Sequence, residues 1–334
     1  MSGGKHIFFL FFIAAVAVVV AFEIKAAQGE GLFQPGRATD AVATAEAPSA
    51  APRIDPDFLA SPSSTPATPP EPLPKPADAA ASPAYPAPAE DTVTADAYLV
   101  GDLATGKIYL QKDPDAVMPI ASMSKLVTAI VATDTMSPTT TVEVTEPETE
   151  VYPDPSNLQA GEKFSMKELL YPLLLDSSNV AAEALASSTD RAHFLNLMNG
   201  YAWEIGMSHS YFGDPSGLSP HNQASASDFF KLARYVYSSR PDLFQITRIP
   251  SVSVATTSDH GAHAFDSIHP FVRDPRFIGG KTGHTDEAGD TMLTVLRLHG
   301  RPIAVIVLHS LTGERAHDTE LLADKADALL AAGQ

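Results

Sequence analysis

The pattern of hydrophobic and polar residues divides the chain into an apolar head, a polar proline-rich stretch and a long segment with regular periodicity. In the head, residues 7–22 carry no charge. A helix of this length would rise about 24 Å, slightly less than the hydrocarbon core of a bilayer and slightly more than the apolar part of a signal peptide. We expect residues 1–27 to be a signal or membrane anchor. The small residues around Ala21 leave cleavage open, and the anchor is the favoured alternative.

The proline-rich stretch, residues 28–92, is expected to be a disordered linker. Fourteen of the 28 prolines lie between Pro35 and Pro88, among alanine, serine and threonine. Such a composition buries too little apolar surface to offset the entropy lost on ordering. A spacer of this length is useful when its start is fixed to a membrane, which is why the anchor is favoured. The alternative is an expendable tail.

From residue 93 to residue 334 the periodicity predicts one α+β domain. Runs typical of strands occur at both ends of this segment, at 97–103, 107–110, 251–256, 277–283, 290–298 and 302–310. Apolar residues at helical spacing dominate the part between, and further helices are expected over 121–136 and 319–331. The elements predict an antiparallel sheet built from the N- and C-terminal parts, flanked by helices, with an inserted mainly helical subdomain.

Charge and cysteine content exclude several classes of function. The formal net charge is −18, and residues 91–334 contribute −14 of it, from 17 Lys and Arg against 31 Asp and Glu. Nucleic acids require a basic surface, so no nucleic-acid partner is expected. The chain contains no cysteine, which rules out a thiol nucleophile and a cysteine-ligated metal.

Three short motifs follow one another in the order S-x-x-K, S-x-N and K-T-G. They are Ser122-Met123-Ser124-Lys125, Ser177-Ser178-Asn179 and Lys281-Thr282-Gly283. Each has an ordinary structural explanation when taken alone: a helix N-cap, a polar turn between helices and a surface turn. The string at Ser2 to Lys5 also matches the first motif, but it lies in the targeting segment. The order and predicted settings of the three together indicate acyl transfer through a serine ester.

The residue types in these motifs suit nucleophilic catalysis. A serine hydroxyl attacks a carbonyl only when a base takes its proton, and Lys125 lies on the same helix face as Ser122. Burial and the second cation, Lys281, would both lower the pKa of Lys125 toward neutrality. A helix start at Ser122 would bring backbone N–H groups to the reacting carbonyl. Lys281 and Thr282 suit a substrate carboxylate, and a glycine in their strand would let a substrate backbone lie close to its edge.

Two other features carry less weight. His260, His263 and His269 form a cluster without the H-E-x-x-H arrangement, so neither a metal site nor a cofactor is expected. Trp203 is the single tryptophan, and it is expected in the core.

Residues 95–331 resemble the D-alanyl-D-alanine carboxypeptidases, which are low-molecular-mass penicillin-binding proteins and serine D,D-peptidases. The resemblance extends beyond the motifs to the approach to Ser122, Gln111-Lys112-Asp113-Pro114-Asp115 and Met118-Pro119-Ile120-Ala121, then to Gly217-Leu218, Ser225-Ala226-Ser227-Asp228 and His284-Thr285 with Ala288-Gly289. It implies a β-lactamase/D,D-peptidase-like fold. It also implies peptidoglycan stem peptides as substrate and β-lactams as covalent inhibitors, with no cofactor.

The resemblance also implies roles for individual residues. Ser122 would be the acylated nucleophile and Lys125 its base, with Ser177 relaying a proton and Asn179 binding the substrate amide. The backbone N–H groups of Ser122 and His284 would form the oxyanion hole. Further residues would bind the terminal carboxylate of the substrate: Lys281, Thr282 and Gly283 of the third motif, and Arg315 as a weaker candidate.

Two departures from related patterns bear on function. Val180 stands where many relatives have an acidic residue, which leaves the local polarity open. Ala192 stands where class A β-lactamases carry the glutamate that deacylates the enzyme, so a β-lactam ester should be long-lived. We therefore expect a carboxypeptidase on the extracytoplasmic face of the cell membrane, or secreted if the signal is cleaved. The alternatives are a D,D-endopeptidase on cross-links, a β-lactamase and a non-catalytic wall-binding module.

Overall fold

The structure is a computed structural model that describes residues 92–151 and 153–333. The expected anchor, 1–27, and all of the expected linker except Thr92 lie outside the described residues. Within the two described ranges, no helix combines the length and the apolar character needed to cross a membrane.

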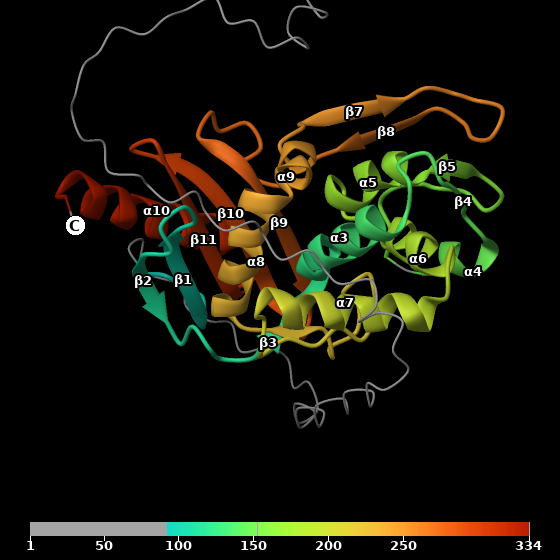
Figure 1. Ribbon diagram of the computed structural model, residues 1–334. Helices are drawn as coiled ribbons and strands as arrows, with labels where there is room; N and C mark the ends of the chain where they lie inside the picture. Colours follow the sequence, from blue (N-terminus) through green and yellow to red (C-terminus); the bar gives the residue numbers. More distant parts are fainter. Residues whose placement is uncertain (1–91, 152, 334) are drawn as a thin grey trace, which may run out of the picture. The chain divides into compact units, whose positions relative to one another are not determined.

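A five-stranded antiparallel sheet in the order β2-β1-β11-β10-β9 carries the fold (Figure 1). Because β1 pairs with β11, the first and last strands of the domain are neighbours in the sheet. This confirms the predicted α+β fold with a sheet built from both ends of the domain. The edge strand β9 contains the K-T-G motif. The strands are β1 (Ala97–Asp102), β2 (Ile108–Lys112), β9 (Phe277–Thr285), β10 (Gly289–Leu298) and β11 (Arg301–Ser310).

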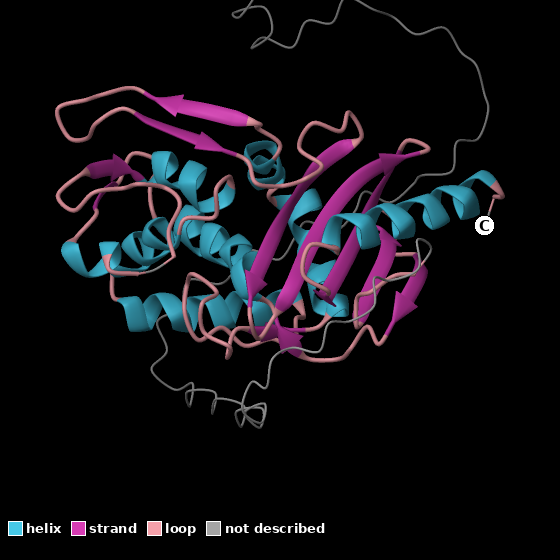
Figure 2. Cartoon of the chain, turned by 180° about the vertical axis from the view of Figure 1, so that it is seen from behind, coloured by secondary structure: helices cyan, strands magenta, loops and turns pink. Residues whose placement is uncertain are grey.

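Helices cover both faces of this sheet. One face packs against α10 (Arg315–Ala331), and the other against α8 (Ala226–Ser239) and α9 (Pro241–Thr247), as Figures 1 and 2 show from opposite sides. Side chains of β11 alternate between two clusters, with Ile306 in the larger and Val305 in the smaller. Burial on both faces explains why β10 and β11 read as almost continuous apolar runs.

The remaining elements lie between β2 and β9, mostly as the predicted helical subdomain. Its helices are η1 (Ala121–Ser124), α3 (Lys125–Thr135), α4 (Glu146–Thr149), α5 (Met166–Leu174), α6 (Asn179–Ser187) and α7 (Arg191–Ile205). Short strand pairs also occur: β3 (Met118–Pro119) with β6 (Gln223–Ala224), β4 (Thr141–Glu143) with β5 (Lys163–Ser165), and β7 (Ser251–Val254) with β8 (His263–Asp266). The strands of two or three residues were not predicted because they are too short to show a period.

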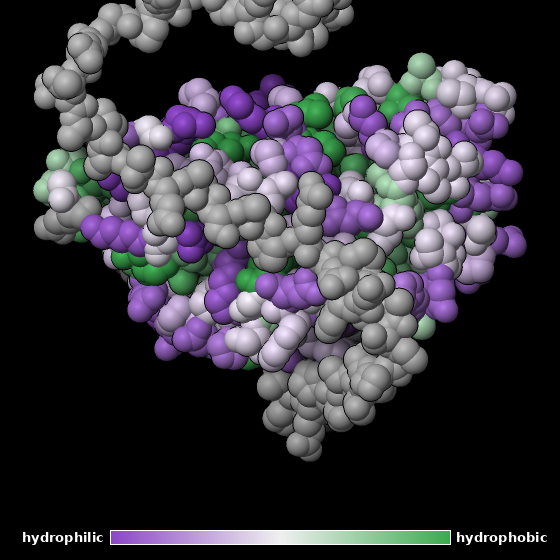
Figure 3. Space-filling model, viewed as in Figure 1, coloured by the Kyte–Doolittle hydropathy of each residue, from purple (hydrophilic) through white to green (hydrophobic). Residues whose placement is uncertain are grey.

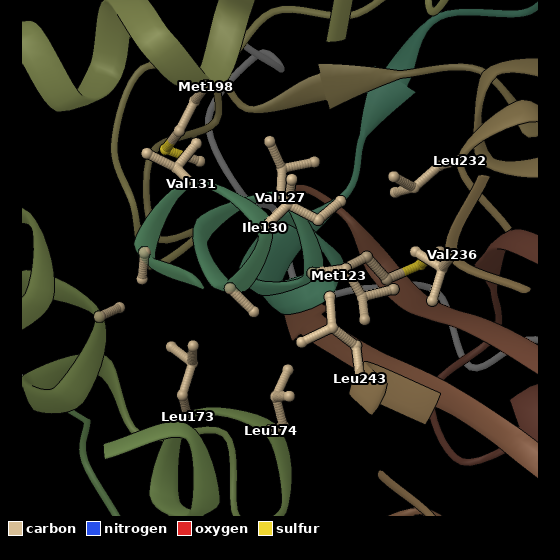
Figure 4. Packing of buried hydrophobic residues seen from close by; sticks show 14 of the residues in the cluster. Met123, Val127, Ile130, Val131, Leu173, Leu174, Met198, Leu232, Val236 and Leu243 are labelled. Carbon is tan, nitrogen blue, oxygen red and sulfur yellow. The ribbon is translucent and has the colours of Figure 1, made fainter. Parts of the chain in front are cut away.

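Helix α3 runs through the middle of the larger hydrophobic cluster (Figure 4). Its residues Lys125 to Ala132 are all buried. Side chains from η1 and α3 lie among those of four other helices, including Leu173 of α5, Met198 of α7, Val236 of α8 and Leu243 of α9. The single helix expected over 121–136 begins as the 3₁₀ turn η1. Packing on all sides fixes the position of the helix start, where the first motif lies.

Trp203 is an incorrect prediction, because 71% of its surface is exposed. The buried face of α7 contains Phe194, Leu197 and Met198, with Tyr201 and Ala202 in the last turn, and Trp203 lies on the opposite side. Among the coloured residues of Figure 3, hydrophilic side chains surround scattered hydrophobic ones. Such isolated apolar side chains are ordinary at a protein surface.

Candidate active site

The nucleophile candidate Ser122 lies in η1 on a constrained backbone. The residue before it, Ala121, has φ +48°, in the left-handed region that is unfavourable for an L-residue. Gly217 (φ +89°) packs directly against this segment, and a Cβ at residue 217 would lie 2.1 Å from the Ala121 carbonyl oxygen. The loop at Gly217 therefore supports the backbone that presents Ser122.

Lys125 is fully buried and has three hydrogen-bond partners around its Nζ. The Nζ lies 2.9 Å from Ser122 Oγ and 2.7 Å from Asn179 Oδ1, and it donates to the Ser216 carbonyl oxygen. A carbonyl or amide oxygen can only accept. A neutral Lys125 amine would therefore donate its two protons to Asn179 and Ser216, and its lone pair would face the Ser122 hydroxyl. This is the arrangement of a base and its nucleophile.

Burial lowers the pKa of Lys125 to about 7. The charges of four carboxylates oppose the effect of burial: Asp214, Asp154, Glu183 and Asp176. A base with a pKa near neutrality is free of its proton in a large fraction of molecules at pH 7. The prediction that burial would make Lys125 available as a base is supported by this environment.

Ser177 and Lys281 form the second hydrogen-bonded pair of the site. Ser177 lies between α5 and α6 with φ +70°, and its Oγ is 2.9 Å from Lys281 Nζ, which also donates to the Thr282 carbonyl oxygen. Burial lowers the pKa of Lys281 well below its usual value, and the positive charges of Lys125 and Arg315 lower it further. The charge of Lys125 thus acts on Lys281, whereas burial is the cause that lowers the pKa of Lys125 itself.

Asn179 connects the second motif to Lys125. It is the first residue of α6, and while its Oδ1 accepts from Lys125 its Nδ2 donates to the Pro153 carbonyl oxygen. Both ends of the amide are thus engaged by the protein, so Asn179 orients Lys125 in addition to any contact with a substrate. Val180, expected as a departure from related chains, is buried in the core.

Asp154 and Ser216 are site residues that the sequence did not reveal. The Asp154 carboxylate accepts from the backbone N–H groups of Asn179 and Val180 and from Ser178 Oγ, which anchors the N-terminus of α6 from 25 residues away in the chain. Helix N-termini favour such an anion. Neither residue is part of a sequence motif with a recognisable spacing. The contacts of both depend on how their loops fold against α3 and α6.

The K-T-G strand packs tightly against the nucleophile segment. A Cβ at Gly283 would lie 2.7 Å from the Ile120 carbonyl oxygen and 2.5 Å from Thr291 Oγ1. Thr291 Oγ1 also donates to that carbonyl. The structure thus gives Gly283 a packing role, in addition to the approach of a substrate expected from the sequence, and places β9 beside Ser122.

His284 and Arg315 meet at the end of β9. His284 Nδ1 is 2.8 Å from Asp290 Oδ1, while Arg315 Nη1 donates to the Gly283 carbonyl oxygen at 2.9 Å and lies 3.6 Å from Asp290 Oδ1. The structure therefore brings the weaker candidate Arg315 to the K-T-G strand. Asp290 is buried, so part of the positive charge of Arg315 is compensated within the protein.

Two of the three candidate histidines, His260 and His263, pack on the same ring of Phe164, and His269 lies elsewhere. His260 stacks on Phe164 with ring centroids 4.4 Å apart, and His263 Nε2 is 2.9 Å from Glu162 Oε1. His269 Nε2 is 3.1 Å from the Leu293 carbonyl oxygen, and burial lowers its pKa to about 3. In residues 92–151 and 153–333, no three His, Asp or Glu side chains are grouped so that they could hold a metal ion.

The site and the fold have counterparts in known proteins. The family model of peptidase S11, described as D-alanyl-D-alanine carboxypeptidase, matches residues 84–312. A D-alanyl-D-alanine endopeptidase of Pseudomonas aeruginosa is 31% identical over 227 residues, which are 66% of this chain and 72% of that protein. The D-alanyl-D-alanine carboxypeptidase DacB2 of Mycobacterium tuberculosis is 30% identical over 225 residues, covering 66% and 76% of the two chains.

Solved structures show the same fold. A D-alanyl-D-alanine carboxypeptidase from Mycobacterium tuberculosis superimposes with a TM-score of 0.66 at 26% identity, covering 71% of this chain and 92% of that one. Penicillin-Binding Protein D2 from Listeria monocytogenes, in its cefotaxime-bound form, gives a TM-score of 0.62 at 28% identity over 70% and 97% of the two chains. The β-lactamase/D,D-peptidase-like fold class is thereby confirmed.

Proposed function

The chain belongs to the D-alanyl-D-alanine carboxypeptidase family, and from this premise we propose that Ser122 is the nucleophile through which it removes the terminal D-alanine of peptidoglycan stem peptides. The observation that carries the assignment is the 2.9 Å separation of Ser122 Oγ from Lys125 Nζ, with Lys125 buried. A serine peptidase needs a nucleophile within hydrogen-bond reach of a base whose pKa is near the working pH. This pair meets both requirements.

Acylation follows from the contacts around Lys125. Neutral Lys125 takes the hydroxyl proton as Ser122 Oγ bonds to the carbonyl carbon of the penultimate D-alanine. The carbonyl oxygen gains the negative charge, and the backbone N–H groups of Ser122 and His284 are proposed to stabilise it. The carbon–nitrogen bond then breaks, and the proton held by Lys125 passes by way of Ser177 to the leaving amine. Free D-alanine leaves, and the rest of the peptide stays as an ester on Ser122.

Deacylation requires a water molecule in place of the leaving amine. Water adds to the ester carbonyl, a base takes its proton, and Ser122 Oγ departs with a proton, so that the shortened peptide is released as a carboxylic acid. By microscopic reversibility the groups that protonated the leaving amine, Ser177 and Lys125, can deprotonate this water. Lys281, Thr282 and Arg315 are proposed to bind the carboxylate of the terminal D-alanine, since they offer positive charge and a hydroxyl along β9.

β-Lactams are the proposed covalent inhibitors. Penicillin-Binding Protein D2 has been solved with cefotaxime and with ampicillin bound. In this chain Ala192, the position of the deacylating glutamate of class A β-lactamases, is an exposed residue in the first turn of α7. A slow loss of the ester is expected. Rapid turnover of penicillin that disappears in Ser122→Ala would favour a β-lactamase instead.

Labelling with a fluorescent penicillin tests the nucleophile. The wild-type protein should be labelled at Ser122, located by mass spectrometry of the labelled peptide, and Ser122→Ala should not be labelled. A matched control is Ser137→Ala, which removes an exposed hydroxyl after α3 and should leave labelling unchanged. Absence of label in the folded wild-type protein would favour a non-catalytic wall-binding module.

An endopeptidase activity is the second candidate, because the Pseudomonas aeruginosa relative is a D-alanyl-D-alanine endopeptidase. Both reactions attack a D-alanine carbonyl, and they differ in the leaving group. Incubation with a pentapeptide and, separately, with a cross-linked muropeptide dimer distinguishes them by the masses of the products. Release of free D-alanine from the pentapeptide is the expected result; cleavage of the dimer alone would replace the carboxypeptidase assignment by the endopeptidase.

We propose that residues 1–27 hold this enzyme at the extracytoplasmic face of the cell membrane and that residues 28–92 act as its spacer. The proposal is supported by the uncharged run 7–22 and by the concentration of proline between Pro35 and Pro88. Membrane fractionation with N-terminal sequencing provides the test. An intact N-terminus in the membrane fraction indicates an anchor, and a soluble chain that starts after Ala21 indicates a cleaved signal.

A further inference from the structure

Asp214 is a buried carboxyl whose hydrogen bonds the reaction described above does not use. It lies in the loop between α7 and β6, with 9% of its surface exposed. Its carboxylate accepts from the backbone N–H groups of Ser216, Gly217 and Ser219. It also accepts from Ser216 Oγ at 3.1 Å and from Asn222 Nδ2 at 3.2 Å. A carboxylate that binds several N–H groups of its own loop fixes the conformation of that loop.

Asn222 closes the same loop from its other end. The Asn222 Oδ1 accepts from the Gly213 N–H at 2.7 Å and from the Asp214 N–H at 3.0 Å, and its Nδ2 donates to the Asp214 carbonyl oxygen at 3.0 Å. The Asn222 carbonyl oxygen accepts from the Ile120 N–H at 3.0 Å. Asp214 and Asn222 therefore form one buried unit that is attached to the backbone two residues before Ser122.

The loop is attached to α3 through two successive carbonyl groups. Thr128 Oγ1 donates to the Pro215 carbonyl oxygen at 2.6 Å, and Lys125 Nζ donates to the Ser216 carbonyl oxygen. Lys125 and Thr128 lie three residues apart and so share one face of the helix. Ser216 is thus bound on one side by Asp214, through its N–H and its hydroxyl, and on the other side by Lys125.

Gly217 extends the influence of Asp214 to the nucleophile segment. Its N–H donates to the Asp214 carboxylate, and its Cα packs so closely on the Ala121 carbonyl that a Cβ would lie 2.1 Å from the oxygen. One carboxylate therefore fixes two neighbouring residues, of which Ser216 contacts the base and Gly217 supports the backbone of Ser122.

We propose that Asp214 is a positioning residue: it holds the Ser216 carbonyl oxygen on Lys125 Nζ, and this contact directs the lone pair of the neutral amine at the nucleophile. The role deepens the proposed function and rests on Ser122 being the nucleophile. Asp214 itself touches neither Ser122 nor Lys125 through a hydrogen bond, because the partners of its carboxylate are the loop residues Ser216, Gly217, Ser219 and Asn222.

The need for such a holder follows from the proton count of an amine. Neutral Lys125 has two protons and one lone pair, and the lone pair faces Ser122 Oγ only while both protons are engaged elsewhere. Asn179 Oδ1 takes one proton at 2.7 Å, and the Ser216 carbonyl takes the other. If the Ser216 carbonyl moved away, the free proton could turn toward Ser122 Oγ, and the amine would then act as a donor instead of a base.

The test is stopped-flow acylation of the full chain by a fluorescent penicillin at pH 9, over a range of penicillin concentrations. Burial lowers the pKa of Lys125 to about 7, so at pH 9 the amine is mostly neutral, and a further fall of its pKa would not change the rate. Asp214→Asn keeps the shape of the side chain and replaces one acceptor oxygen by a donor. The limiting rate should fall roughly tenfold or more, because small displacements of a reacting group are costly. The half-saturating concentration should stay unchanged, because the carboxylate does not bind Lys281 or Thr282.

Asp190→Asn is the matched control. The Asp190 Oδ1 also accepts from two backbone N–H groups, those of Ala192 and His193, at 2.9 and 3.2 Å. This aspartate is exposed at the start of α7. The substitution should leave the limiting rate and the half-saturating concentration of the wild-type protein unchanged.

The two measured quantities separate positioning from a structural role. A folded Asp214→Asn protein with the wild-type limiting rate would overturn the proposal even if its melting temperature fell, and so would a change confined to the half-saturating concentration. If Asp214→Asn does not fold, amide hydrogen exchange of the wild-type protein decides. The N–H groups of Ser216, Gly217 and Ser219 should be protected about a hundredfold or more relative to an unstructured peptide. Exchange without protection would overturn the role, since a loop that opens freely cannot hold a carbonyl on Lys125.

Failure of the proposed function gives a different result. A folded wild-type protein without label at Ser122 contradicts the proposed nucleophile and this role together. Normal labelling of the wild-type protein, with the same limiting rate in Asp214→Asn, contradicts the role of Asp214 alone.

Discussion

At the scale of single side chains, the environment of Lys125 decides whether this lysine is a structural cation or a catalytic base. A buried lysine with three partners could hold a fold together as a cation, and the carboxylates around it favour that state. Complete burial disfavours the charged form and has the larger effect on the pKa of Lys125. Because burial outweighs the carboxylates and brings the pKa of Lys125 to about 7, the protonation state of Lys125 changes near neutral pH.

The first prediction is an acid limit on acylation. Protonated Lys125 has no lone pair for the Ser122 proton, so the acylation rate should fall below a pKa of about 7. Well below that pKa the loss approaches tenfold per pH unit, since only the neutral fraction reacts. Stopped-flow labelling with a fluorescent penicillin between pH 5 and pH 9 measures the limit. A rate that stays constant down to pH 5 would show that Lys125 is not the base.

At the scale of elements, the site depends on contacts that join loops to the starts of helices and strands. Ser122 is presented by η1, which rests on the loop at Gly217 and on strand β9 at Gly283. The close approach of these three segments leaves no space for a Cβ at either glycine. The position of Ser122 therefore depends on glycine at two sites that are far apart in the chain, Gly217 and Gly283.

The second prediction concerns Gly217. Alanine at this position would have to adopt φ +89° and place its Cβ 2.1 Å from the Ala121 carbonyl oxygen. We expect Gly217→Ala to destabilise the domain by about 3 kcal/mol or more and to reduce labelling of Ser122 strongly. Urea unfolding and labelling rates measure the two effects.

Gly161→Ala is the matched control, because Gly161 also has φ +89° but a Cβ there would have no neighbour within 4 Å. It should cost about 1 to 2 kcal/mol from backbone strain alone and leave labelling intact. Equal effects of the two substitutions would mean that the contact between Gly217 and Ala121 is unimportant.

The same scale explains which features could be predicted from the sequence. Strands of nine or ten residues and the three motifs were found because each carries a local pattern: an apolar run, or a fixed spacing of serine, lysine and asparagine. Asp154 and Ser216 were missed because their roles depend on burial and on segments that meet only after folding. Trp203 was misplaced because its size suggests burial, while the face of α7 on which it lies is decided by its neighbours.

At the scale of the whole domain, the first residues and the last helix hold one another. Thr94 donates from its N–H and from its Oγ1 to the two carboxylate oxygens of Asp318, both at 2.7 Å. Asp318 is completely buried in α10. Strands β1 and β11 are neighbours in the sheet. The contact between Thr94 and Asp318 adds a second link between the start of the domain and its C-terminal part.

The third prediction tests this link. Asp318→Ala removes both acceptors and leaves the Thr94 N–H and hydroxyl without their partner, so the free energy of unfolding should fall by about 2 to 3 kcal/mol. Asp327→Ala on the same helix removes a half-exposed carboxylate paired with His299, and such a surface pair is worth less than about 1 kcal/mol. The Asp318 carboxylate accepts its hydrogen bonds from Thr94 and not from Ser122, Lys125 or Ser177, so penicillin labelling of the folded Asp318→Ala protein should match wild type. Equal destabilisation by the two substitutions in chemical unfolding would show that the ends of the domain are held by strand pairing alone.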